Sequence, residues 1–255
     1  MIMLLGETAA AREISKCLDI RGLEFIRLQA WTAKTCMKAP TLIMDASPPS
    51  SNIKLAPLRQ WCEQLGIPYL RLERPETVIP VSLLIYPVYT WDEALLRLEQ
   101  RVAAMHQAKG RIVTIFVTTG SHQLESIVQS SFARYARLVV RVLPEGRLVQ
   151  KCQELGISTR DIVAMQGQFS KDINKALFKF YGADILLTRD SGSAGGTDTK
   201  ISAALELGID TVLVKRAKMS AGLIVYSVQE LLDWVDANSS KWIANAEGKI
   251  TTLIR

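Results

Sequence analysis

The sequence ADILLTRDSGSAGGTDTKISAALELGIDTVLVKR, residues 183–216, decides the fold class. Its apolar run Ile185–Leu187 predicts a strand buried on both faces, as in a parallel sheet. A turn rich in glycine follows, and then a helix whose apolar residues share one face and which Gly208 ends. Thr211–Val214 is the next buried strand. The order strand, turn, helix, strand is typical of a doubly wound α/β fold.

The turn between this strand and this helix, Arg189–Gly196, is almost without side-chain bulk. A bare backbone between the carboxyl end of a strand and the amino end of a helix leaves N–H groups free to bind an anion. Such a turn can also serve close packing alone. Charged and hydroxyl side chains are interleaved with the glycines, which favours a ligand. We expect Thr197 or Asp198 to cap the helix.

The order of residues in this turn and helix resembles the C-terminal signature of the precorrin-6A reductase family, the reductases of cobalamin biosynthesis. The family pattern is a Thr-Lys-Asp/Asn-Ser-Gly turn, further glycines, a lysine, an Ala-Ala pair and Leu-Gly-Ile. The matching residues are Thr188, Asp190, Ser191, Gly192, Gly195, Gly196, Lys200, Ala203, Ala204, Leu207, Gly208 and Ile209. Arg189 stands where the family usually has lysine. A match of this length is far more specific than one glycine motif.

The first turn of the chain, after the apolar strand Met1–Leu5, is Gly6-Glu7-Thr8. Family members usually have Gly-Gly-Thr at this place. A second glycine lets the backbone approach a phosphate, whereas a carboxylate repels it. We therefore expect weakened or altered phosphate binding here, with Gly6 and Thr8 left as cofactor contacts.

A second turn begins at Asp45 and resembles the family's Asp-Ala-Thr-His-Pro-aromatic-Ala. Pro48 stands in place of the histidine and Ser50 in place of the aromatic residue, so a proton donor and a stacking surface are both absent. Asp45, or water held by Ser47, is then the remaining candidate for a catalytic proton donor. We expect Ser50 and Ser51 to contact the substrate.

The run Arg71-Leu72-Glu73-Arg74-Pro75 matches the family's Arg-x-Glu-Arg-Pro intact. Two arginines beside a glutamate can form a structural network of ion pairs, or they can present a guanidinium to a carboxylate of a ligand. Both interpretations stay open. For the second, Arg71 and Arg74 are the candidate substrate contacts, and Arg74 is the favoured one.

Turns in the second half repeat the same arrangement. The β-branched run Arg111–Val117 leads into a hydroxyl-rich turn ahead of a helix, which is a second candidate for anion binding. Two further segments match the family, Arg141–Pro144 and Gln166–Ser170, the latter with Gln168 in place of proline. The predicted cofactor contacts are Gly6, Thr8, Thr118, Thr119, Gly120, Arg141, Gln166, Gly167, Thr188, Arg189, Asp190, Ser191, Gly192, Gly195, Gly196, Thr197, Lys200 and Arg216.

Strands alternating with helices over the whole chain predict two doubly wound, Rossmann-like domains of parallel sheet, with a cleft between the carboxyl edges of the sheets. We expect an N-terminal domain over 1–109, a C-terminal domain over 110–237 and a tail over 238–255, since a new strand-turn-helix series starts after Lys109-Gly110. Pro87 indicates that the strand within Val81–Tyr89 lies at an edge.

Composition limits the classes of function. The chain has two histidines and scattered cysteines, so we expect no metal site and no histidine-based triad. It has no long apolar run, which predicts a soluble, cytoplasmic protein without a membrane partner. A net charge of +6 is consistent with an anionic ligand, and it is equally consistent with a surface whose charges only keep the protein soluble. Nucleic acid is disfavoured because no block of lysine and arginine or basic helix face is present.

The resemblance covers about residues 2 to 216 and implies a reductase that transfers a hydride from NADPH or NADH to a corrin-ring precursor, a small tetrapyrrole. Such chemistry needs positioning more than a nucleophile or a metal. Two alternatives stay open: an impaired relative that binds a tetrapyrrole or dinucleotide without turnover, and an unrelated α/β enzyme of phosphorylated sugars. The sequence fixes neither the choice of nicotinamide, nor the presence of cobalt in the ring, nor the oligomeric state.

Overall fold

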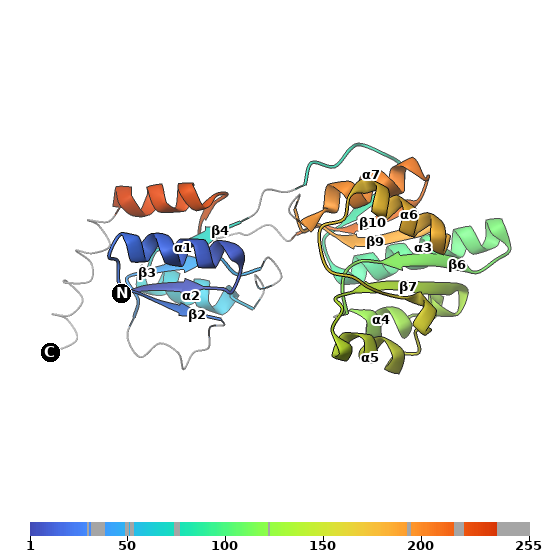
Figure 1. The fold of residues 1–255 in the computed structure, drawn as a ribbon, viewed down its shortest axis with the longest axis horizontal. Coiled ribbons are helices and arrows are strands. Elements are labelled where there is room, and N and C mark those ends of the chain that lie inside the picture. Colours follow the sequence, from blue (N-terminus) through green and yellow to red (C-terminus); the bar gives the residue numbers. More distant parts are fainter. Residues whose placement is uncertain are drawn as a thin grey trace. The chain divides into compact units, whose positions relative to one another are not determined.

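The structure is a computed structural model that describes residues 1–29, 31, 39–48, 51, 54–73, 77–121, 123–192, 195–216 and 222–238. The chain divides into two compact units (Figure 1). Unit 1 combines Met1–Pro75 with Lys218–Arg255, and unit 2 is Glu76–Ala217.

Unit 1 contains a five-stranded sheet in the order β11-β4-β3-β1-β2. Every pair of neighbouring strands is parallel. The strands are β1 (Ile2–Leu5), β2 (Phe25–Leu28), β3 (Leu42–Asp45), β4 (Tyr69–Leu72) and β11 (Leu223–Val225). Because the strands are parallel, the turns that leave β1, β3 and β4 lie at one edge of the sheet.

Helices cover both faces of this sheet (Figure 1). Helix α1 (Ala9–Ile20) and a final helix over residues 228–238 pack on one face, where Ile14 and Leu231 share a buried cluster. Helix α2 (Ala56–Leu65) packs on the other face through Leu58 and Cys62. Burial on both faces explains why the central strands are apolar throughout.

Unit 2 contains a six-stranded sheet in the order β5-β10-β9-β6-β7-β8, again with every pair parallel. The strands are β5 (Ile85–Val88), β6 (Val113–Val117), β7 (Ala136–Val142), β8 (Ile162–Ala164), β9 (Ile185–Arg189) and β10 (Asp210–Val214). Strand β5 lies at the edge, as Pro87 predicted.

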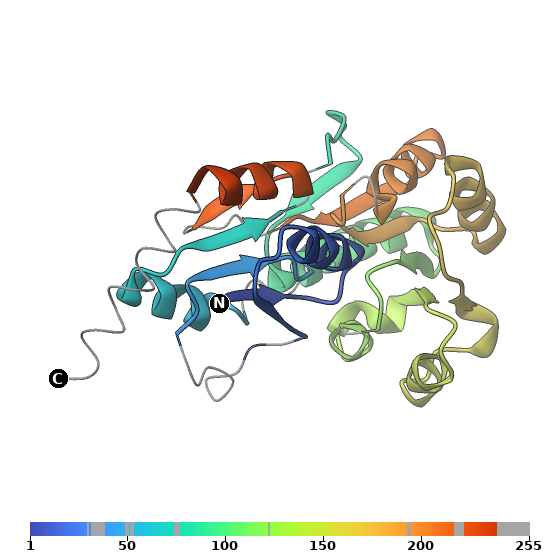
Figure 2. The same ribbon diagram turned by 60° about the vertical axis from the view of Figure 1, so that its left-hand side comes forward.

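Two layers of helices enclose the sheet of unit 2. Helices α3 (Trp91–Lys109), α4 (Leu124–Val128) and α5 (Gly146–Glu154) pack on one face. Helices α6 (Lys171–Tyr181) and α7 (Thr197–Glu206) lie side by side on the other (Figures 1 and 2). The predicted class, two doubly wound parallel-sheet units, is therefore confirmed.

The boundary between the units differs from the one expected at Lys109-Gly110. Strand β5 pairs with β10, and helix α3 packs into the core of unit 2. At the other end of the chain, β11 pairs with β4 in unit 1. The chain thus crosses between the units twice, and the segment 76–109 belongs to unit 2 while the residues from Lys218 onward belong to unit 1.

One predicted helix cap is wrong. Neither Thr197 nor Asp198 caps α7, which begins after Gly196 in the left-handed conformation without a side-chain cap. Ser170, by contrast, caps α6, because its side chain accepts from the amide of Ile173. Among the described residues no helix combines the length and the apolar character needed to cross a membrane.

Candidate functional site

The predicted ligand turns of unit 2 gather at one edge of its sheet. Neighbouring strands β10, β9, β6, β7 and β8 all end there, because every pair is parallel. Thr118–Gly120 follow β6, Gln166 and Gly167 follow β8, and the Asp190–Gly196 turn follows β9. Arg141 is near the end of β7, and Arg216 follows β10. The carboxyl edge of such a sheet is where α/β proteins bind ligands.

Lys200 is the most unusual charge at this edge. Its side chain belongs to α7 and the residue is only 6% exposed. Its ammonium forms no hydrogen bond or ion pair within the part of the chain that the structure describes. Burial, together with the charge of Arg141, lowers the pKa of Lys200 to about 8, and Asp190 and Asp198 offset this only in part.

Arg141 is the second cation at this edge and has no acidic partner among the described residues. Its Nη1 donates to Oδ1 of Asn174 at 2.9 Å, and its guanidinium lies 5.0 Å from the ring centre of Phe169. Burial lowers the pKa of Arg141 to about 10. A buried cation and a partly buried one are costly when neither has an ion pair, and a bound anion relieves that cost.

Hydroxyl groups at the same edge add donors. The Oγ1 atoms of Thr119 and Thr188 are buried and have no hydrogen-bond partner within the described ranges. Thr118 is already engaged, since its Oγ1 donates to the carbonyl of Leu187 at 3.2 Å. Gln166 and Gly167 are exposed. The arrangement can bind a phosphate or carboxylate through Lys200 and Arg141.

Asp190 and Arg216, by contrast, are held inside unit 2. Asp190 is 1% exposed, and its Oδ1 accepts bonds from the Gly192 amide at 3.0 Å and the Thr77 hydroxyl at 2.7 Å. Arg216 donates from Nε to the Asp190 carbonyl at 3.1 Å. These contacts occupy Oδ1 of Asp190, while its Oδ2 is buried and has no hydrogen-bond partner within the described residues.

The glycine turn is closed on itself by the Thr197 hydroxyl, which accepts from the Ser191 amide at 3.0 Å and donates to the Arg189 carbonyl at 3.3 Å. A Cβ on Gly195 would lie 2.0 Å from the Ser191 Oγ. Gly195 is therefore required for packing inside the turn, whether or not a ligand approaches it. Gly196 has a φ of +65°, which favours glycine.

In unit 1, Asp45 lies at the centre of a buried network. Its Oδ1 accepts from the Ser47 amide at 2.9 Å and is 2.8 Å from Nη1 of Arg71, while its Oδ2 accepts from the Tyr69 hydroxyl. Arg71 also donates to Ser47 Oγ at 2.9 Å and to Glu73 at 3.2 Å. Burial and the Asp45 carboxylate raise the pKa of Tyr69.

This network changes the roles expected for three residues. Asp45 and Arg71 are 0% exposed and Ser47 is 8% exposed. The carboxylate of Asp45 and the guanidinium of Arg71 are bonded to each other, while Nη2 of Arg71 is buried without a hydrogen-bond partner among the described residues. The structural alternative for Arg71, a network of ion pairs, is the one observed. Asp45 and Arg71 fix the turn after β3 to strand β4.

Gly6 and Thr8 also serve packing. A Cβ on Gly6 would lie 2.8 Å from the Ala46 carbonyl oxygen, and its φ is +115°. Thr8 caps α1 through the Ala11 amide and donates to the Ala46 carbonyl at 2.8 Å. Glu7, the residue that departs from the family, accepts from Gln29 Nε2 at 2.9 Å. This turn is thus bound to the turn after β3.

Two predicted substrate contacts, Ser50 and Arg74, lie outside the described residues. Ser51 is described, and its amide donates to the Pro48 carbonyl at 2.9 Å. Sequence reasoning did not assign a role to Tyr69 or Thr77. Neither belongs to a motif, and each acquires its role from a partner remote in the chain.

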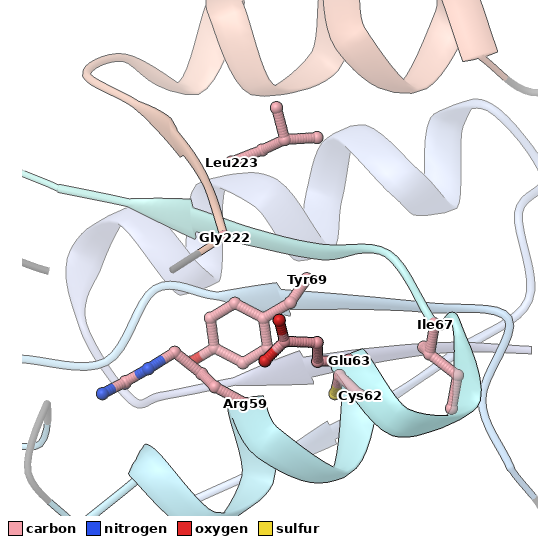
Figure 3. Close-up of a pocket in the computed structure, with 7 residues that line it drawn as sticks. All are labelled: Arg59, Cys62, Glu63, Ile67, Tyr69, Gly222 and Leu223. Atoms are coloured by element: carbon pink, nitrogen blue, oxygen red, sulfur yellow. The ribbon is translucent and has the colours of Figure 1, made fainter. Parts of the chain in front are cut away.

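A cavity of about 340 Å³ lies beside α2, β4 and β11 in unit 1 (Figure 3). Its lining residues are Arg59, Cys62, Glu63, Ile67, Tyr69, Gly222 and Leu223. Tyr69 is shared with the Asp45 network, but none of the predicted site residues lines this cavity. Within the described ranges, no three His, Cys, Asp or Glu side chains gather closely enough to hold a metal ion.

Comparison with known proteins gives this geometry its context. A cobalt-precorrin-6A reductase of Priestia megaterium is 34% identical over 74% of this chain and 71% of the relative. One of Methanothermobacter thermautotrophicus is 32% identical over 91% of this chain and 71% of the relative. A solved structure of CobK precorrin-6A reductase has the same fold, with a TM-score of 0.68, 19% identity and coverage of 92% of this chain and 96% of that one. Residues 1–236 match the family described as Precorrin-6x reductase CbiJ/CobK, and the chain belongs to that family.

Proposed function

We propose that the protein is a reductase of cobalamin biosynthesis that transfers a hydride from NADPH or NADH to a corrin-ring precursor, precorrin-6A or its cobalt form. The observation that carries the proposal is the family match over residues 1–236, which includes the turns of both units. The named relatives are cobalt-precorrin-6A reductases. The family is one of oxidoreductases, and the hydride donor is our inference.

The residues of unit 2 fit a dinucleotide. Its phosphates are anions. Lys200 is a buried cation and Arg141 a partly buried one, and neither has an ion pair among the described residues. In this proposal they hold the phosphates, with the Thr119 hydroxyl as a further donor. The exposed Gln166-Gly167 turn and Arg189 contribute additional cofactor contacts. When bound, the nicotinamide supplies the hydride and the protein supplies position and charge.

The residues around Asp45 act indirectly in this proposal. The Asp45–Arg71 ion pair holds the backbone between Asp45 and Pro48 in one conformation. Ser50, Ser51 and Arg74, which follow these two strands in the chain, are the proposed substrate contacts. A corrin precursor carries several carboxylates, which Arg74 can bind in a bidentate manner. The proton that completes the reduction then comes from water, since Asp45 is enclosed.

An anaerobic assay tests the proposal. The purified protein is mixed with NADPH or NADH and with precorrin-6A or its cobalt form, and nicotinamide oxidation is followed by absorbance. We expect oxidation that requires both the protein and the macrocycle. If the cofactor binds but is not oxidised with either macrocycle, the result would favour the alternative that Pro48 and Ser50 suggest, a family member that binds its ligands without turnover. Failure to bind either nicotinamide would reject the proposed donor.

A further inference from the structure

Asp190 joins three segments of unit 2 that are remote in sequence. Its Oδ1 accepts the Thr77 hydroxyl at 2.7 Å and the Gly192 amide at 3.0 Å. Its carbonyl accepts Nε of Arg216 at 3.1 Å, and Nη2 of Arg216 lies 3.8 Å from Oδ1. One residue therefore connects the glycine turn to Thr77 and to Arg216.

Thr77 and Arg216 stand at special places in the chain. Unit 2 is Glu76–Ala217, so Thr77 directly follows the first crossing from unit 1 and Arg216 directly precedes the return. Asp190 is 113 residues from Thr77 and 26 from Arg216. The described residues closest to the two ends of unit 2 are thus both bonded to the residue that begins the glycine turn.

Burial makes these bonds strong. Asp190 is 1% exposed, Thr77 is 8% exposed and the Arg216 side chain is 7% exposed. Hydrogen bonds to a buried carboxylate are little screened by water and are costly to break. Asp190 is itself fixed to the sheet, because its amide donates to the Val214 carbonyl at 2.9 Å. The three segments are therefore held against the ends of β9 and β10.

We infer that Asp190 is a positioning residue that couples the glycine turn to Thr77 and Arg216, the described residues next to the two ends of unit 2. The expected effect on cofactor affinity rests on the proposed function of the turn. The tether, meaning the bonds that join Asp190 to Thr77, Gly192 and Arg216, does not depend on that function. Loss of the bond from Thr77 or from Arg216 loosens the turn, and an ordered turn restrains Thr77 and Arg216.

Four variants test the tether by amide hydrogen exchange without ligand. Asp190→Asn weakens the charge-assisted bonds, Thr77→Val removes the hydroxyl at constant shape, and Thr77→Ser restores it. Asp210→Asn is the matched control, since Asp210 is 2% exposed and bonded to Arg101 at 2.6 Å at the amino end of β10. Loss of a charge-assisted bond makes local exchange roughly tenfold faster.

We expect faster exchange at the Gly192 and Lys215 amides in Asp190→Asn and Thr77→Val, and wild-type exchange in Thr77→Ser and Asp210→Asn. The dissociation constants of NADPH and NADH, measured in parallel, should rise in the first two variants only. Faster exchange confined to the substituted residue, or the same pattern in Asp210→Asn, would overturn the inference. If the wild type binds neither nicotinamide, the proposed donor fails, and exchange still decides the tether.

Discussion

Replacing Lys200 by methionine should make the protein more stable and a poorer binder of its cofactor. Lys200 is 6% exposed as a residue and has no ion pair within the described residues, so the fold bears the cost of desolvating a charge. Methionine has a similar length and no charge. An increase in stability at the expense of binding is the expected sign of a residue kept for function.

The magnitude follows from the pKa of Lys200, which falls from the ordinary 10.5 to about 8 in the fold. At pH 7 the lysine is charged in both states, and the difference between the two pKa values corresponds to about 3 kcal/mol against folding. Between pH 8 and 10.5 the unfolded chain binds more protons than the folded one, so stability rises with pH. Lys200→Met should therefore gain up to about 3 kcal/mol at pH 7 and progressively less above pH 8.

Two measurements check this prediction. Urea unfolding at several pH values between 7 and 9.5 gives the change in the free energy of unfolding. Titration with NADPH and NADH gives the dissociation constants. In the wild type the bound phosphate raises the pKa of Lys200, so affinity should be constant below pH 8 and fall as pH rises through it. In Lys200→Met that part of the pH dependence should vanish.

Lys175→Met is the matched control, because Lys175 is a more exposed lysine paired with Glu206 at 2.7 Å. We expect its stability to change by no more than about 0.5 kcal/mol and its cofactor affinity not to change. The reasoning is refuted if Lys200→Met is less stable than the wild type at pH 7. It is also refuted if the variant binds both nicotinamides as tightly as the wild type.

Three further predictions concern unit 1. Gly6→Ala should destabilise the protein by about 2 kcal/mol or more in urea unfolding, because its Cβ would meet the Ala46 carbonyl and φ is +115°; a loss below about 0.5 kcal/mol would contradict this. Tyr69→Phe should cost about 1–3 kcal/mol by the same measurement, since it leaves a buried carboxylate oxygen short of a donor; equal stability would show that the bond is dispensable. Pro48→His combined with Ser50→Phe should raise turnover at saturating cofactor, by up to roughly a hundredfold, more than it raises cofactor affinity; a wild type already at about 1–10³ per second would contradict this.

Local pattern was sufficient to predict the class of fold. Runs such as Ile185–Leu187 are apolar because helices cover both faces of each sheet, and that pattern implies parallel strands. The division into units was not predictable in the same way. Strand β11 pairs with β4 although about 150 residues separate them, and no local periodicity encodes such a partner.

The site shows the same limit at the level of single residues. Motifs correctly placed the turns at the carboxyl ends of strands, since a strand's end follows from its sequence. They did not reveal which way a side chain points. Asp45 and Asp190 look like ligand contacts in sequence, yet partners remote in the chain, Tyr69 and Thr77, enclose them. Only the structure distinguishes Lys200 from the other predicted cofactor contacts, because it shows that this lysine is buried without an ion pair among the described residues.

The central claim, hydride transfer from a nicotinamide to a corrin-ring precursor, is tested most directly by isotope transfer. The protein is incubated without oxygen with precorrin-6A or its cobalt form and with NADPH or NADH carrying deuterium at the reactive C4 position. Mass spectrometry of the macrocycle then reports where the label has gone. The account predicts a reduced macrocycle that carries one deuterium from the nicotinamide, formed more slowly by Lys200→Met at limiting cofactor. Two results would contradict it. One is a reduced macrocycle that carries no deuterium, whichever face of the nicotinamide C4 is labelled, and the other is no reduction of either macrocycle.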